Sequence, residues 1–173
     1  MSLTQKLGRI LQVIDSIGDH VGMVARWITV VIIAISLFAT GARYLFDRPP
    51  IWGYELQTML WAVLVLFSGY YAVRFDAHVR FDVIYRRLSP RRRATLNCIT
   101  FLFFFIFFIA IMLEAVPYAW DSFLRKERLV SLWGPPIWPV KILVPIAGVF
   151  FLVQGIANYV RYLYTAITGK ELI

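Results

Sequence analysis

The chain has 173 residues, of which 60% are hydrophobic and only 16% are charged, and its formal net charge is +8. Soluble domains carry about 25% charged residues, so this composition excludes an ordinary soluble domain and indicates a membrane protein. The basic residues lie in the gaps between apolar segments, where topology signals belong, and this placement argues against nucleic-acid binding. The single cysteine, Cys98, excludes an intrachain disulfide and a cysteine-based metal cage.

The N-terminal segment, residues 1–22, has neither the continuous apolar core nor the cleavage site of a signal peptide. Apolar residues recur there at helical spacing and share one face: Leu3, Leu7, Ile10, Leu11, Ile14, Ile17 and Val21. The opposite face is polar and includes Asp15 and Asp19. The pattern predicts an amphipathic helix over about residues 4–22, either lying on the membrane surface or packed on a partner subunit.

Four later segments are apolar over the length of about 20 residues that a helix needs to cross a bilayer. They cover about residues 27–46, 54–73, 95–116 and 137–160. Each must be helical, because lipid offers no partner to open backbone groups. Pro49 and Pro50 break the chain after the first segment, so the first two form a hairpin. The predicted fold is an all-α integral membrane protein: one domain over residues 1–173, with four transmembrane helices plus an N-terminal amphipathic interfacial helix.

The gap between the second and third segments, residues 74–93, is rich in arginine. Cytoplasmic loops of membrane proteins carry such an excess of basic residues, so this loop is predicted to be cytoplasmic. Because two crossings lie on either side of this loop, both termini are also expected in the cytoplasm. Residues 117–136 then form the outer loop, and the tryptophans near its end lie at the outer interface.

Three ionisable residues lie near the outer ends of the spans: Arg43, Glu55 and Glu114. Charges inside a membrane are costly, and mixed signs at one depth predict a structural ion pair of Arg43 with Glu55 or Glu114. No carboxylate lies near the middle of a span, which argues against ion coupling by this chain alone. The two histidines, His20 and His78, lie outside the spans, which disfavours a haem held between two histidines.

Enzyme motifs are absent from the sequence, so we expect no catalytic, substrate-binding or metal site and no cofactor. In the last span, Pro145 lies beside the small residues Ala147 and Gly148, which favours helix packing over a substrate cavity. Gln154 and Asn158 are four residues apart on one face. They are expected to form interhelical hydrogen bonds, within this chain or to a partner.

Three stretches of the sequence resemble the small membrane subunit, of the DctQ type, of tripartite ATP-independent periplasmic (TRAP) transporters. The residues that carry the resemblance are Arg43, Tyr44, Phe46, Arg48, Pro49, Trp52, Glu55, His78, Arg80, Asp82, Trp138, Pro139, Pro145 and Gln154. They follow the order of the family along the chain. One departure is visible: members often carry a second carboxylate beside Glu55, and here Tyr54 and Leu56 flank it.

The resemblance implies a sodium-coupled importer of an organic acid or related solute in the bacterial inner membrane. A periplasmic binding protein captures the solute, and a large membrane subunit carries the substrate and sodium sites. The small subunit, surrounded by membrane lipids, is expected to act as a scaffold for the large one. Its expected contacts with the capture protein are Arg48, Arg125, Lys126 and Arg128. Two alternatives stay open: an autonomous homo-oligomeric ion-coupled transporter, and a haem-bearing membrane anchor.

Overall fold

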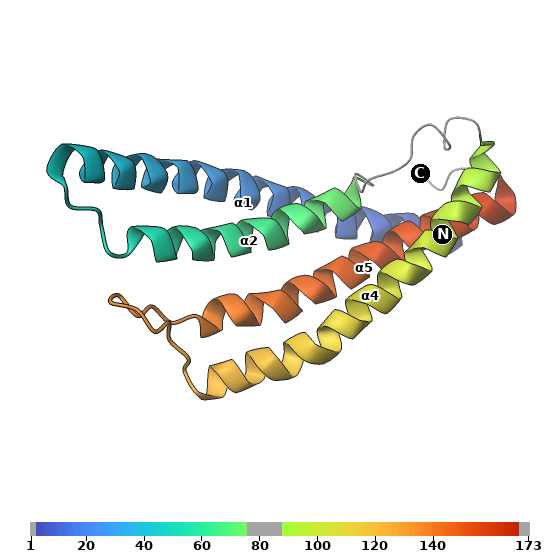
Figure 1. Ribbon diagram of the computed structural model, residues 1–173. Helices are drawn as coiled ribbons and strands as arrows, with labels where there is room; N and C mark the ends of the chain where they lie inside the picture. Colours follow the sequence, from blue (N-terminus) through green and yellow to red (C-terminus); the bar gives the residue numbers. More distant parts are fainter. Residues whose placement is uncertain (1–2, 76–87, 170–173) are drawn as a thin grey trace.

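The structure, a computed structural model, describes residues 3–75 and 88–169 (Figure 1). The helices in these ranges are α1 (Leu3–Phe46), α2 (Gly53–Arg74), α4 (Pro90–Leu124) and α5 (Trp138–Thr168). All four are long and apolar enough to cross a membrane, and the described ranges contain no β-strand beyond an isolated bridge between Arg128 and Pro136. The predicted all-α membrane fold with four spanning helices is therefore confirmed.

The helices lie in a row, in the order α1, α2, α5, α4 (Figure 1). α1 packs on α2, α4 packs on α5, and the two hairpins meet mainly through α2 and α5, with a smaller contact between α1 and α5. Both hairpin turns lie at one end of the row, which we call the hairpin end, whereas α1 starts and α5 finishes at the opposite end. A row, unlike a closed bundle, leaves two broad faces of the helices open to lipid or to a partner.

The predicted separate N-terminal helix is not confirmed, because α1 runs without a break from Leu3 to Phe46. At 1.5 Å per residue its 44 residues extend about 66 Å, roughly twice the thickness of the hydrocarbon core. No proline interrupts this stretch. The N-terminal half packs on the same chain: Leu11 lies against Ala157 of α5, and a Cβ at Gly22 would overlap the ring of Tyr71 in α2.

The helix α4 continues past the predicted end of the third span, through Pro117 to Leu124. A proline inside a helix removes one backbone hydrogen bond. The turn after it is nevertheless held in place, because Ala119 and Ser122 are buried. The predicted break at the following prolines is present: residues 125–137 are not helical, and Pro139 occupies the first turn of α5.

The buried core lies mainly between α2 and α5. It contains Tyr70 and Val73 of α2 with Ala147 and Phe151 of α5, and Phe108 of α4 stacks on Phe151 with ring centroids 4.8 Å apart. In the most apolar 18 residues of α5, 33% are buried, whereas in the corresponding part of α4 11% are buried. α5 is therefore the central helix, and α4 presents most of its apolar surface outward.

Candidate functional site

Seven polar side chains from three helices gather toward the end of the row where α1 starts. This polar cluster comprises Asp15, Asp19, Tyr70, Arg74, Gln154, Asn158 and Arg161. α1 supplies the two carboxylates, α2 supplies Tyr70 and one arginine, and α5 supplies both amides and the other arginine. The cluster joins α1, α2 and α5 at one level of the row.

Two ion pairs form the charged part of the polar cluster. Arg161 Nη2 lies 2.6 Å from Asp15 Oδ2, and about a quarter of each side chain is exposed (22% and 25%). Arg74 donates to Asp19 Oδ1, and its Nε lies 4.0 Å from Asp15 Oδ1. Two cations thus face two carboxylates, so the cluster is balanced in charge. Opposite charges at such distances stabilise one another most where water is partly excluded.

The amides extend the polar cluster into the core. Gln154 is fully buried: its Oε1 accepts from the Tyr70 hydroxyl at 3.3 Å, and its Nε2 donates to Asp15 Oδ1 at 3.2 Å. Asn158 Nδ2 donates to the Val73 carbonyl at 2.7 Å. That carbonyl lies in the last turn of α2, where the helix itself leaves acceptors unpaired. The predicted interhelical hydrogen bonds of Gln154 and Asn158 are confirmed, and they form within this chain.

A second group of polar side chains holds residues 125–137 at the hairpin end. The Glu127 carboxylate accepts from Lys141 Nζ and from Ser122 Oγ, each at 2.6 Å. Lys141 Nζ also lies 2.9 Å from the Tyr118 hydroxyl. The hydrogen bonds from Lys141 and then Ser122 lower the pKa of Glu127 below its usual range. The connection is thereby tied to both α4 and α5.

The structure does not join the three residues predicted to pair. Within residues 3–75 and 88–169, no ion pair links Arg43 to Glu55 or Glu114. Arg43 lines a polar groove of about 340 Å³ between α1 and α2, whereas Glu114 is exposed on α4, at the far side of the row. Glu55 Oε2 is buried and has no hydrogen-bond partner among the described residues. The row arrangement explains the separation of Glu114 from Arg43, since α2 and α5 lie between α1 and α4.

Other residues of the family resemblance occupy several places at the hairpin end. Trp52 stacks on Phe38, with ring centroids 6.0 Å apart. Tyr44 and Phe46 are exposed, and Pro49 lines the same polar groove as Arg43. His78, Arg80 and Asp82 lie outside the described residues. On α5, Trp138 packs edge-on against Phe123, and Pro139 and Pro145 are both within the helix.

The side chains expected to contact the capture protein all lie near the hairpin end and are exposed: Arg48, Arg125, Lys126 and Arg128. Arg48 belongs to the first hairpin turn and the other three to the second. Two are bonded to oxygen atoms within the chain: Arg125 pairs with Asp121 at 2.9 Å, and Arg128 Nε donates to the Gly134 carbonyl at 2.7 Å.

Sequence reasoning missed the ion pairs of the polar cluster. A signal was present, because Asp15 and Asp19 lie one turn apart on the polar face of their helix. Arg74 and Arg161 follow apolar segments at the same side of the membrane. Assigning the N-terminal helix to the membrane surface hid this complementarity. In the part of the chain that the structure describes, no three potential metal ligands come together.

Comparison with known proteins identifies the family. The family model for the DctQ component of tripartite ATP-independent periplasmic transporters matches residues 30–164. The chain belongs to this family. The ectoine TRAP transporter small permease protein TeaB of Halomonas elongata is 28% identical over 162 residues, covering 93% of this chain and 69% of the relative. The chain is thus a small permease subunit of a TRAP transporter, and the resemblance inferred from the sequence is confirmed.

Proposed function

We propose that this small permease is a static scaffold in a sodium-coupled TRAP importer of the bacterial inner membrane. A large membrane subunit, held beside the helix row, carries the substrate and sodium sites. A periplasmic binding protein delivers an organic acid or related solute to it. In this arrangement the small permease anchors and stabilises the large subunit and does not itself bind the solute.

The polar cluster is the observation that carries this proposal. Its ion pairs and amides bond α1, α2 and α5 to one another, so these helices are fixed within the chain. The groove between α2 and α5 is lined by apolar side chains such as Leu66, Leu143 and Phe150. Tyr70 also lines it, but its hydroxyl already donates to Gln154, whereas solute sites need a few well-placed polar groups. Helices bonded to one another beside a groove of mainly apolar side chains suit a support.

The open row also supports a partner on one of its broad faces. Large apolar side chains of α4 are exposed: Leu102, Phe103, Ile106, Phe107, Ile109 and Leu113. Lipid and a large subunit are both suitable neighbours for such a surface. With the arginine-rich gap in the cytoplasm, the polar cluster lies toward the cytoplasmic side and the hairpin end faces the periplasm. The exposed Arg48 then lies where a capture protein docks.

Affinity purification tests the scaffold proposal. The tagged chain is extracted from its native membrane in mild detergent, and bound proteins are identified by mass spectrometry. We expect a large multi-span membrane protein in stoichiometric amount. As a matched comparison, the same purification with the polar cluster weakened by Arg161→Gln should recover less of that partner. Recovery of the unaltered chain alone, as a defined homo-oligomer, would refute the proposal.

One observation favours the alternative, an autonomous ion-coupled homo-oligomer. The buried Oε2 of Glu55 has no hydrogen-bond partner among the described residues, and buried carboxylates in membranes often carry protons or ions. The alternative requires Glu55 or Glu114 for flux. Transport by the chain reconstituted without other proteins that survives Glu55→Gln combined with Glu114→Gln excludes it, whereas transport abolished in a homo-oligomer that stays intact supports it.

A further inference from the structure

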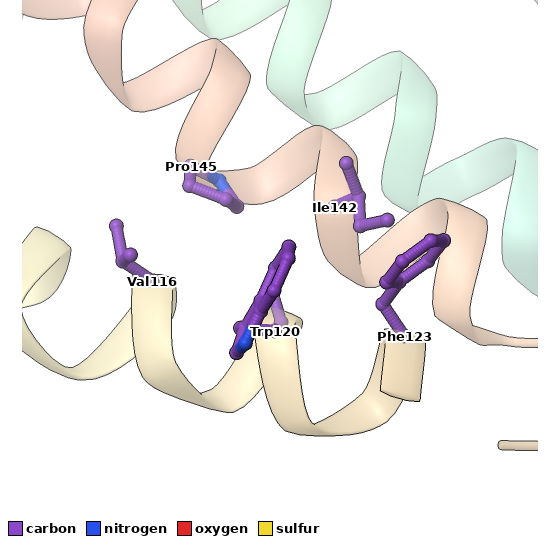
Figure 2. A pocket seen from close by; sticks show the side chains of 6 residues that line it. Val116, Trp120, Phe123, Ile142 and Pro145 are labelled. Carbon is purple, nitrogen blue, oxygen red and sulfur yellow. The ribbon is translucent and has the colours of Figure 1, made fainter. Parts of the chain in front are cut away.

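A groove between α4 and α5 opens near the hairpin end and has a volume of about 290 Å³. Six residues line it: Val116, Ala119, Trp120, Phe123, Ile142 and Pro145. Figure 2 shows Trp120 reaching from α4 toward Pro145 and Ile142 of α5, with Val116 on one side of it and Phe123 on the other. The lining is apolar, so the groove accepts hydrocarbon more readily than a polar solute.

Aromatic rings and a cation lie beside one lining residue. The Phe123 ring packs against Trp120 and edge-on against Trp138, with centroids 5.7 and 5.3 Å apart. Lys126 Nζ lies 3.7 Å from the Phe123 centroid and 4.7 Å from a Trp138 ring. Toward the C-terminal end of α4, the apolar groove is therefore followed by aromatic rings and then by an ammonium group.

The ammonium of Lys126 differs from its basic neighbours in having no oxygen partner among the described residues. Arg125 is paired with Asp121, Arg128 donates to a backbone carbonyl, and Lys141 is bonded to Glu127. Lys126 is exposed, and its ammonium lies over the rings of Phe123 and Trp138. Its three donors are thus available to an anion, and the rings hold the ammonium in place.

We propose that this groove binds one acyl chain of an anionic phospholipid whose phosphate contacts Lys126. The order of groove, aromatic rings and ammonium matches the order of acyl chain, interfacial region and phosphate in a lipid. Burying methylene groups in the groove is favourable, and a charge-assisted hydrogen bond to the phosphate adds to it. An apolar side chain of the large subunit is the competing occupant, but it leaves the ammonium without a partner.

Lipid binding to the delipidated full chain is measured by native mass spectrometry, with phosphatidylglycerol and phosphatidylcholine of identical acyl chains. We expect one phosphatidylglycerol molecule to be retained in preference. Lys126→Gln should weaken its retention about tenfold, as expected for one charge-assisted hydrogen bond. Arg125→Gln removes the same charge one residue away and should leave retention unchanged. Equal losses in both variants, or equal retention of the two lipids, would overturn the proposal.

Filling the groove tests the acyl-chain half of the proposal. Val116→Trp should reduce retention of phosphatidylglycerol, whereas Ile106→Trp, at an exposed position of α4 outside the groove lining, should not. Where Val116→Trp fails to fold, quenching of tryptophan fluorescence by one equivalent of phosphatidylglycerol with brominated chains replaces it. Trp120→Phe should then remove more of the quenching than Trp61→Phe. If Trp61→Phe removes more of the quenching than Trp120→Phe, or if the lipid is lost when the large subunit is added, the proposed site is contradicted.

Discussion

Breaking the ion pair between Asp15 and Arg161 should destabilise the whole row, because this pair joins the first helix to the central one. The charged groups are bidentate, at 2.6 and 3.4 Å. Opposite charges at about 4 Å attract by about 4 kcal/mol at an effective dielectric constant of about 20. Both side chains are partly exposed, so water screens roughly half of this attraction, and we expect a coupling free energy of about 2 kcal/mol.

The coupling is measured by a double-mutant cycle with Asp15→Asn, Arg161→Gln and both together. The free energy of unfolding is followed by tryptophan fluorescence as SDS is added to mixed micelles. Asparagine keeps the oxygen that accepts from Gln154, so the cycle isolates the charge pair. The exposed pair of Asp121 and Arg125 serves as the control, because such pairs contribute only about 0.3–0.5 kcal/mol. Additive effects at Asp15 and Arg161, or equal couplings in both cycles, would refute the reasoning.

Three further predictions concern packing, pH and orientation. A Cβ at Gly155 would lie 2.6 Å from Phe104, so Gly155→Ala should lower the free energy of unfolding by about 1–3 kcal/mol. Gly41 has open space around it, so Gly41→Ala should raise the free energy of unfolding by about 0.4–1 kcal/mol. Similar values for the two variants would contradict the close contact between α4 and α5. Because the folded pKa of Glu127 lies below its ordinary value of 4.5, its stabilisation is present above that value and is lost as the pH falls further. The melting temperature of the Glu127→Gln protein should therefore fall less in acid than that of the unaltered chain. Equal falls in both proteins would refute this. Reporter fusions at the C-terminus should report a cytoplasmic location, and a periplasmic signal would overturn the orientation.

Hydrophobic length predicted the four spans well, because about 20 apolar residues have only one way to cross lipid. It could not predict the continuity of α1. The polar face with Asp15 and Asp19 fits a membrane surface and a packed helix equally well, and only the arginines of α2 and α5 decide between them. A helix end at Pro117 was likewise expected from the proline alone, whereas the burial of Ala119 and Ser122 extends the helix beyond it.

The site was predicted in part. Gln154 and Asn158 were recognisable because amides in an apolar segment need partners, and they find them in α1 and α2. The predicted pairing of Arg43 with Glu55 or Glu114 rested on their common depth in the membrane, which does not tell which helices are neighbours. A one-dimensional hydrophobic pattern does not distinguish a row from a bundle, since lipid-facing and protein-facing surfaces are both apolar.

The most direct test of the scaffold role locks α1 to α5 in the assembled transporter. In a Cys98→Ala background, Leu11→Cys and Ala157→Cys place two thiols in one buried contact, and loss of free thiols reports the disulfide. Sodium-driven uptake is then measured in proteoliposomes before and after oxidation, with each single cysteine as control. A static scaffold predicts unchanged uptake. Uptake that falls on oxidation and returns on reduction would show that these helices move during transport and would contradict the account.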